Sequence, residues 1–134
     1  MQDVDVNWIA IIVAAIVPMV LGALWYSPLL FADPWMRAVG RSREELGDAA
    51  LGYLLSAVGA FLSSYVLARI MRWAEVDDFW NGALVGGSVW VGFVATVLAV
   101  TTYFSGRPRM LWLINAGYQL VALVLMGAIL GAWD

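Results

Sequence analysis

The sequence predicts an all-α membrane protein, a bundle of four transmembrane helices with a short interfacial helix between the first and second spans. Of its 134 residues, 63% are hydrophobic and only 13% are charged. A soluble domain of this length buries too little of its surface to hide so much apolar side chain. The apolar residues also form four long stretches without a charge, separated by connections that carry the charged residues. We therefore expect residues 1–134 to form a single integral membrane domain whose outer surface is covered by lipid.

Each uncharged stretch is long enough to cross a bilayer, which takes roughly 20 residues of helix. The predicted spans are residues 8–26, 49–68, 79–104 and 110–133. These runs are continuous and lack the apolar and polar alternation of barrel strands. Helices are the remaining way to satisfy the backbone in lipid.

Aromatic side chains mark the ends of these spans, where amphipathic rings prefer the headgroup level. Those at or just beyond the predicted ends are Trp8, Trp25, Tyr26, Trp35, Trp73, Trp80, Tyr103, Trp112 and Trp133. Trp90 is the exception, and its position in mid-span indicates a packing or lipid-facing role.

The connection between the first two spans is the only long one. Asp33 followed by Pro34 is typical of a helix N-cap and first helical residue. Trp35, Met36 and Val39 would then form the apolar stripe of a short helix lying on the membrane surface.

Arginine placement predicts the orientation of the chain. Four spans put both termini on one side, which carries only Arg69 and Arg72. The opposite side carries five arginines, which are Arg37, Arg41, Arg43, Arg107 and Arg109. The positive-inside rule therefore places both termini outside.

The residue types that are missing exclude several kinds of chemistry. The chain has no cysteine, histidine or lysine, and its spans contain no charged residue. These absences remove disulfides, imidazole catalysis, and the common ligands of haem, zinc and copper. A net charge of −3 without a basic face argues against nucleic acid as a partner. We expect no metal, no cofactor and no enzymatic activity.

The strongest polar cluster lies in the fourth span, where Asn115 and Gln119 are four residues apart on one helical face, beside Tyr118. One interpretation is that these groups tie the fourth helix to a neighbour. The other is that they line a polar cavity or pore, with Thr96 and Thr101 of the third span as further candidates. Both remain open at this stage.

Two further patterns concern packing. The turn Trp25-Tyr26-Ser27-Pro28 closes the first span. Small residues at four-residue spacing would let helix backbones approach closely, either within the chain or between copies. These pairs are Gly52 and Ser56, Gly59 and Ser63, Gly82 and Gly86, and Gly127 and Gly131.

Several motifs resemble the bacterial family catalogued as domain of unknown function 1761. They are the first-span ending from Gly22 to Phe31, Trp35-Met36, Gly106-Arg107-Pro108 and the run from Leu113 to Tyr118. The similarity covers nearly the whole chain. It implies a small four-span protein of the bacterial inner membrane, and it implies no established activity.

Two functions remain as hypotheses. The first is a homo-oligomer that forms a passage or cavity for a small solute, ion or lipid. The alternative is a membrane scaffold or interaction protein that transports nothing, in which the polar cluster only joins helices.

Overall fold

The computed structural model describes residues 6–27, 29–39 and 49–133, and within these ranges the chain is helical with no strand. Its long helices are α1 (Trp8–Trp25), α3 (Ala49–Trp73) and α6 (Arg109–Ala132), together with a third span from Phe79 to Phe104. The short helix α2 (Ala32–Val39) lies between the first and second spans. The predicted fold class is confirmed.

Two boundaries differ from the sequence-based prediction. Helix α3 continues past Ala68 to Trp73, which carries Arg69 and Arg72 into its last turns, where cations complement the negative end of a helix. Helix α2 begins at Ala32, so Asp33 lies in its first turn and is not its cap. The other predicted span ends agree with the structure to within one residue.

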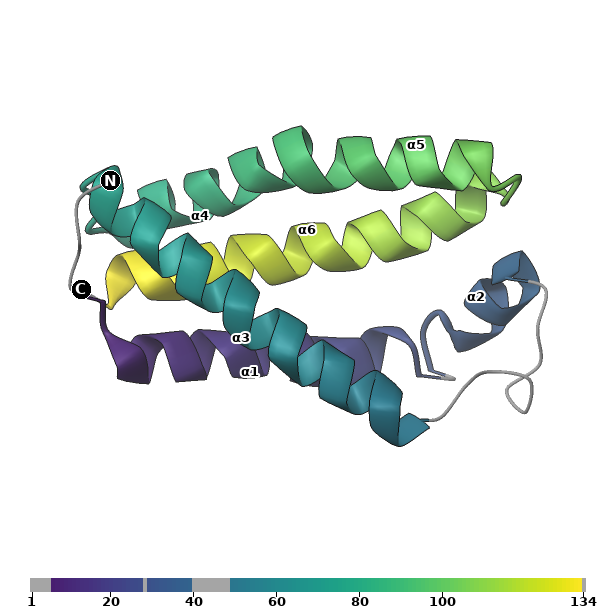
Figure 1. Cartoon of the computed structure of the whole chain (residues 1–134), viewed down its shortest axis with the longest axis horizontal. Coiled ribbons are helices and arrows are strands. Elements are labelled where there is room, and N and C mark those ends of the chain that lie inside the picture. Colours follow the sequence, from purple (N-terminus) through teal and green to yellow (C-terminus); the bar gives the residue numbers. More distant parts are fainter. Residues whose placement is uncertain (1–5, 28, 40–48, 134) are drawn as a thin grey trace.

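Helix α6 lies at the centre of the bundle and contacts every other helical element of the described chain. In Figure 1, α1 lies below it, the third span lies above it, and α3 crosses diagonally in front. Helix α1 begins at the same end of the bundle at which α6 finishes, as four successive spans require.

The third span consists of α4 (Phe79–Val89), the π-helical segment η2 (Trp90–Ala95) and α5 (Thr96–Phe104). Helix α4 packs tightly on α6 through glycines of both helices. A Cβ atom on Gly82 would overlap the carbonyl oxygen of Gly127, and one on Gly86 would overlap that of Leu123. The glycine pairs of α4 and α6 therefore serve contact within the chain.

Segment η2 is attached to α6 by two tryptophans. The indole Nε1 of Trp90 donates to the carbonyl oxygen of Ala116 at 2.8 Å, and that of Trp112 donates to the carbonyl oxygen of Ala95 at 3.0 Å. Trp90 thus has a packing role, one of the two roles expected for it.

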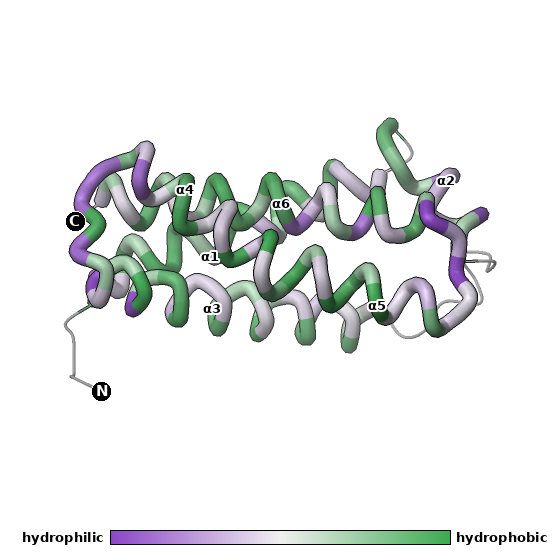
Figure 2. The backbone as a smooth tube through the Cα atoms, turned by 90° about the horizontal axis from the view of Figure 1, so that it is seen from above, coloured by the Kyte–Doolittle hydropathy of each residue, from purple (hydrophilic) through white to green (hydrophobic). Residues whose placement is uncertain are grey.

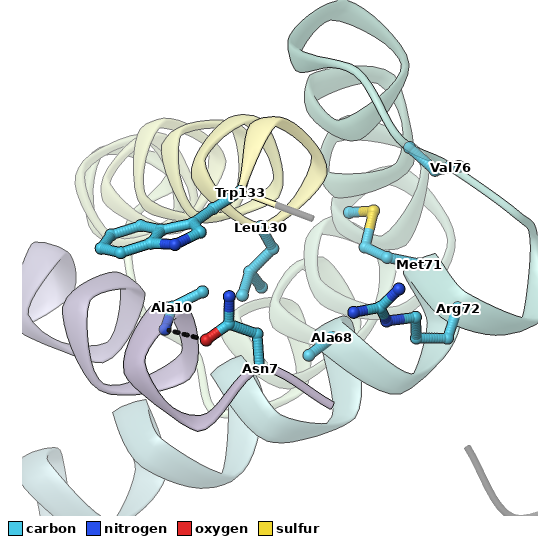
Figure 3. Close-up of a pocket in the computed structure, with 8 residues that line it drawn as sticks. All are labelled: Asn7, Ala10, Ala68, Met71, Arg72, Val76, Leu130 and Trp133. Atoms are coloured by element: carbon cyan, nitrogen blue, oxygen red, sulfur yellow. Dashed lines mark hydrogen bonds between the residues drawn. The ribbon is translucent and has the colours of Figure 1, made fainter. Parts of the chain in front are cut away.

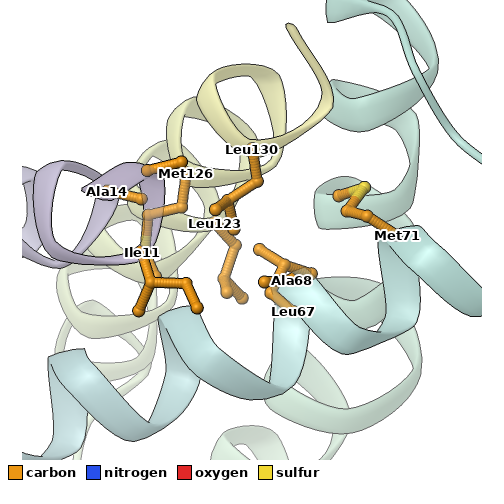
Figure 4. Packing of buried hydrophobic residues seen from close by; sticks show 9 residues of the cluster. Ile11, Ala14, Leu67, Ala68, Met71, Leu123, Met126 and Leu130 are labelled. Carbon is orange, nitrogen blue, oxygen red and sulfur yellow. The ribbon is translucent and has the colours of Figure 1, made fainter. Parts of the chain in front are cut away.

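The buried core lies where α1, α3 and α6 meet, at the end of the bundle where α1 begins (Figure 4). Ile11, Leu67 and Met126 are among its members. Ser64 is fully buried there and donates to the carbonyl oxygen of Ile11 at 2.8 Å, so the crossing of α1 and α3 contains one satisfied polar group.

The first half of α3 leaves this core. Every residue from Ala50 to Gly59 is exposed, and Cβ atoms placed on Gly52 or Gly59 would find nothing within 4 Å. Much of the remaining surface is also apolar, and Figure 2 shows the polar colours gathered toward the ends of the bundle. Such a surface suits lipid and identifies a multi-pass membrane protein.

Candidate functional site

The sequence-predicted polar residues of α6 begin with Asn115, which joins α6 to the end of α1. The hydroxyl of Tyr26 donates to Oδ1 of Asn115 at 2.7 Å. Next to this bond, Nε1 of Trp25 donates to the carbonyl oxygen of Ile114 at 2.9 Å. Asn115 therefore performs the helix-joining role that was one of its two interpretations.

The turn after α1 holds these two aromatic residues in place. The Ser27 hydroxyl donates to the carbonyl oxygen of Leu24 at 2.6 Å, and the Phe31 amide donates to the carbonyl oxygen of Trp25 at 3.0 Å. The predicted turn residues Trp25, Tyr26 and Ser27 thus act together. Pro28, the fourth, lies outside the described residues.

Tyr118 also binds α1, about two turns nearer the middle of that helix. Its hydroxyl donates to the carbonyl oxygen of Pro18 at 2.7 Å. The absence of a side chain at Gly22 makes room for the ring, because a Cβ atom there would lie 3.3 Å from the Tyr118 hydroxyl. Tyr118 both links α6 to α1 and borders a cavity beneath α3.

Gln119 differs from these two residues, because its amide makes no hydrogen bond with any residue that the structure describes. It lies about 15 Å along α6 from Arg109, at 1.5 Å per residue, which places it near the middle of the span. An amide without a partner is unfavourable at this depth in hydrocarbon.

The space that Gln119 faces lies between α3 and the surface formed by α1 and α6. A cavity of about 230 Å³ runs beneath α3 and is lined by Ser56, Ser63, Tyr118 and Gln119, among others. It shares lining residues with a cavity on either side. We call the three together the α3 groove.

The two neighbouring cavities have different linings. The one toward α2 measures about 490 Å³ and is bordered by Tyr26, Ser27 and Tyr53. The one toward α4 and η2 measures about 340 Å³ and is bordered mainly by apolar side chains, such as Val66, Val89 and Val94. Polar groups therefore line the groove from the α2 end to Gln119, and carbon lines most of the remainder.

Thr96 and Thr101, the other predicted site residues, are not brought to the groove. Both are exposed on the third span, and the Thr96 hydroxyl donates to the carbonyl oxygen of Gly92 at 3.0 Å. Neither borders the three cavities.

Tyr53 is the wall residue that the sequence reasoning missed. It is 71% exposed in the half of α3 that leaves the core, and its hydroxyl makes no hydrogen bond within the described chain. No pattern in the sequence indicates it, because its position depends on the angle at which α3 crosses α1.

A fourth cavity lies at the opposite end of the bundle, near Asn7, Arg72 and Trp133 (Figure 3). Asn7 caps α1 there by accepting a hydrogen bond from the Ala10 amide at 3.1 Å. The cavity measures only about 10 Å³, which is at the limit for one water molecule. It is too small for a ligand.

The chemistry of the α3 groove is limited to neutral hydrogen bonding. None of the residues that line its three cavities carries a charge at neutral pH. Among the described residues, no group of three or more histidine, cysteine, aspartate or glutamate side chains could hold a metal ion.

These features define a class of protein, a four-span helical membrane protein with an uncharged groove beneath its second span. The chain belongs to the family described as Protein of unknown function (DUF1761), whose model matches residues 9–131. This match confirms the resemblance found in the sequence. No curated protein and no solved structure matches the chain.

Proposed function

We propose that the protein forms, as a homo-oligomer, a membrane-embedded cavity or passage for a small uncharged solute or lipid. The single observation that supports this most is the Gln119 amide, which faces the α3 groove near the middle of the membrane without a partner in the described chain. Polar groups are retained at such depth when something satisfies them. The proposal includes no catalytic step and no cofactor.

The lining of the groove favours an uncharged occupant over an ion. A charge near the bilayer centre is costly unless an opposite charge or many dipoles compensate it. The groove offers hydroxyls, phenols and one amide instead. The polar lining also stops near Gln119, so one protomer supplies a polar groove that extends only to about the middle of the membrane, and a complete passage would need a second copy.

The homo-oligomer part of the proposal draws on the surface that remains open. The first half of α3 is exposed throughout, and neither η2 nor α5 has a buried residue. The first half of α3 and segment η2 border the groove on its open sides. A second copy placed there would enclose the groove, and native mass spectrometry from nanodiscs would then give a multiple of the 14.6 kDa chain mass. A mass of one chain would contradict this part.

Membrane placement follows the arginine distribution. We propose the bacterial inner membrane with both termini outside, which puts the α2 end of the groove at the cytoplasmic surface. An impermeant thiol reagent added to intact cells should then label Asp77→Cys and spare Ser105→Cys. The reverse pattern would overturn the orientation.

The absence of cysteine allows a direct test of the cavity. Thiols react as thiolates, which need water, so a residue in a wet cavity reacts faster than one facing lipid. With 2-hydroxyethyl methanethiosulfonate, an uncharged reagent, we expect Ser56→Cys and Gln119→Cys to react at least about tenfold faster than Val97→Cys. Val97 is 58% exposed on α5 and serves as the lipid-facing control. Equal, slow reaction at all three positions would contradict an accessible cavity.

One observation favours the scaffold alternative. Asn115 and Tyr118 join α6 to α1, so most of the predicted polar face does structural bonding. A scaffold predicts that the groove is closed by a partner protein that copurifies and that protects Gln119→Cys from the reagent. Reactivity of Gln119→Cys in the purified protein alone would favour the cavity.

A further inference from the structure

The α3 groove has a polarity gradient along its length. At the α2 end it is bordered by Tyr26, Ser27 and Tyr53, and beneath α3 by Ser56, Ser63 and Gln119. Beyond Gln119 its borders are mainly aliphatic. A molecule that fits the whole groove would therefore have a polar part near the membrane surface and an apolar part near the middle of the bilayer.

The hydrogen bonds within the protein determine what the polar part must supply. Four groove hydroxyls already use their protons inside the chain. The acceptors are the Asn115 amide oxygen for Tyr26 and the carbonyl oxygens of Leu24, Gly52 and Pro18 for Ser27, Ser56 and Tyr118. A hydroxyl has one proton and two lone pairs, so each of these oxygens can still accept.

Free donors are fewer in the lining. Only the Tyr53 and Ser63 hydroxyls and the Gln119 amide make no hydrogen bond within the described chain, and each of these groups can accept as well as donate. The groove therefore offers more acceptors than donors. It matches a ligand group that donates hydrogen bonds better than a ketone, ester or ether, which only accepts.

Charge narrows the ligand class further. A phosphate is paired best by arginine or lysine and an ammonium by carboxylates, and the lining has no residue of either kind. The commonest uncharged donor in lipids is the hydroxyl group. The aliphatic cavity beside Val66, Val89 and Val94 then accommodates an alkyl chain.

We propose that the α3 groove binds an uncharged amphiphile with a hydroxyl-bearing head, of the acylglycerol type. Its head lies among Tyr26, Tyr53 and Ser56, and its alkyl chain lies between α3 and η2. This inference rests on the proposed cavity, and it adds the chemical class of the occupant.

The test uses the protein in phosphatidylcholine nanodiscs, because alkyl glycoside detergents carry hydroxyl heads themselves. A monoacylglycerol with a diazirine in its chain is photocrosslinked, and the modified residues are mapped by mass spectrometry. We expect the probe to modify residues in the segment from Leu62 to Ile70, and also Leu123. Both border the aliphatic cavity. Crosslinks spread evenly over the lipid-facing surface of α5 would overturn the proposal.

Competition with unlabelled lipids tests the role of the hydroxyls. Unlabelled monoacylglycerol should compete about three- to tenfold better than the methyl ester of the same fatty acid, since each donated hydrogen bond contributes modestly. Lysophosphatidic acid of the same chain length should compete no better than the ester. Equal competition by all three would overturn the proposal.

Two conservative variants locate the head. Tyr53→Phe removes a hydroxyl from an exposed side chain, so the fold is retained, and it should reduce the advantage of monoacylglycerol over the ester. Ser56→Ala should do the same, whereas Thr101→Val, which removes an exposed hydroxyl outside the groove, should not. An unchanged advantage in both groove variants would contradict the assignment.

The outcomes separate this inference from the proposed function. If Gln119→Cys is unreactive, the cavity itself is rejected. If Gln119→Cys reacts but monoacylglycerol competes no better than the ester, the cavity stands and only the hydroxyl-bearing ligand class is rejected.

Discussion

The hydroxyl of Tyr26 and Oδ1 of Asn115 are 2.7 Å apart, although the two residues are separated by 89 positions in the sequence. This bond fixes the end of α1 against the first half of α6. Gln119, one turn further along α6, has no such partner in the described chain. The two amides of one helical face therefore have different roles, and substitution should separate them.

Asn115→Leu should lower stability, because the Tyr26 phenol would lose its acceptor within the bundle. We expect a loss of about 0.6 to 2 kcal/mol, measured as a lower unfolding midpoint in mild detergent. Gln119→Leu should leave the midpoint unchanged or raise it, since it removes an unpaired amide. Equal losses in the two variants would contradict these separate roles.

Neighbouring serines of α3 provide a second comparison. Ser64→Ala removes the buried bond to the carbonyl oxygen of Ile11 and should cost about 1 kcal/mol. Ser63→Ala removes a hydroxyl that borders the groove without a partner in the described chain, and it should be near neutral. Thermal unfolding of both variants checks this, and a larger effect at Ser63 would mean that α3 is rotated from the position described.

Glycine substitutions test the close contact of α4 with α6. Gly82→Ala places a methyl group against the carbonyl oxygen of Gly127 and should destabilise the protein by about 1 to 3 kcal/mol through overpacking. Gly52→Ala and Gly59→Ala add the same methyl group in open space, where better helix propensity should stabilise by up to about 1 kcal/mol. If all three variants behaved alike in unfolding assays, the glycine contact would be rejected.

Trp90→Phe should weaken the attachment of η2, because phenylalanine cannot donate to the carbonyl oxygen of Ala116. We expect a loss of about 0.5 to 1.5 kcal/mol in thermal unfolding. Trp80→Phe is the matched control, since Trp80 is 75% exposed and its indole makes no hydrogen bond within the described chain. A midpoint unchanged by Trp90→Phe would show that the bond contributes nothing to stability.

Asp78 gives a prediction about pH. Its carboxylate caps α4 by accepting hydrogen bonds from the backbone N–H of Asn81 at 3.0 Å and from the side-chain Nδ2 of Asn81 at 2.7 Å. These bonds hold the pKa of Asp78 below its usual value. The cap therefore contributes its full stabilisation above the unfolded pKa of about 4, and this contribution is lost as pH falls through the lower folded pKa. Asp78→Asn keeps an accepting oxygen, so its unfolding midpoint should fall less steeply over that range than the midpoint of the wild type, and an identical fall would contradict the cap.

The spans could be predicted from the sequence because lipid imposes a simple requirement, a long stretch without charge, that the chain meets four times. Packing was less predictable. The spacing of Gly82 and Gly86 is the same as that of Gly52 and Ser56, yet only the first pair contacts another helix. Which small residues contact another helix depends on helix tilt. No residue pattern in the sequence predicted the π-helical segment η2.

The candidate site could be predicted only in part from the sequence. The polar face of α6 was evident, because amides stand out in an apolar stretch. The different roles of Asn115 and Gln119 on this face depend on where α1 ends and on how α3 crosses. The spacing of residues in the sequence predicts neither. Thr96 and Thr101 lie on the exposed side of the third span, away from the groove.

The central position of α6 has a consequence for biogenesis. The ribosome releases α1, α3 and the third span before the helix that all of them contact. The Tyr26 hydroxyl and the Pro18 carbonyl oxygen therefore gain their partners, Asn115 and Tyr118, only after α6 has been synthesised. A nascent chain that stops before α6 has three inserted helices and lacks the helix that all of them contact, so the bundle can form only once α6 has entered the bilayer.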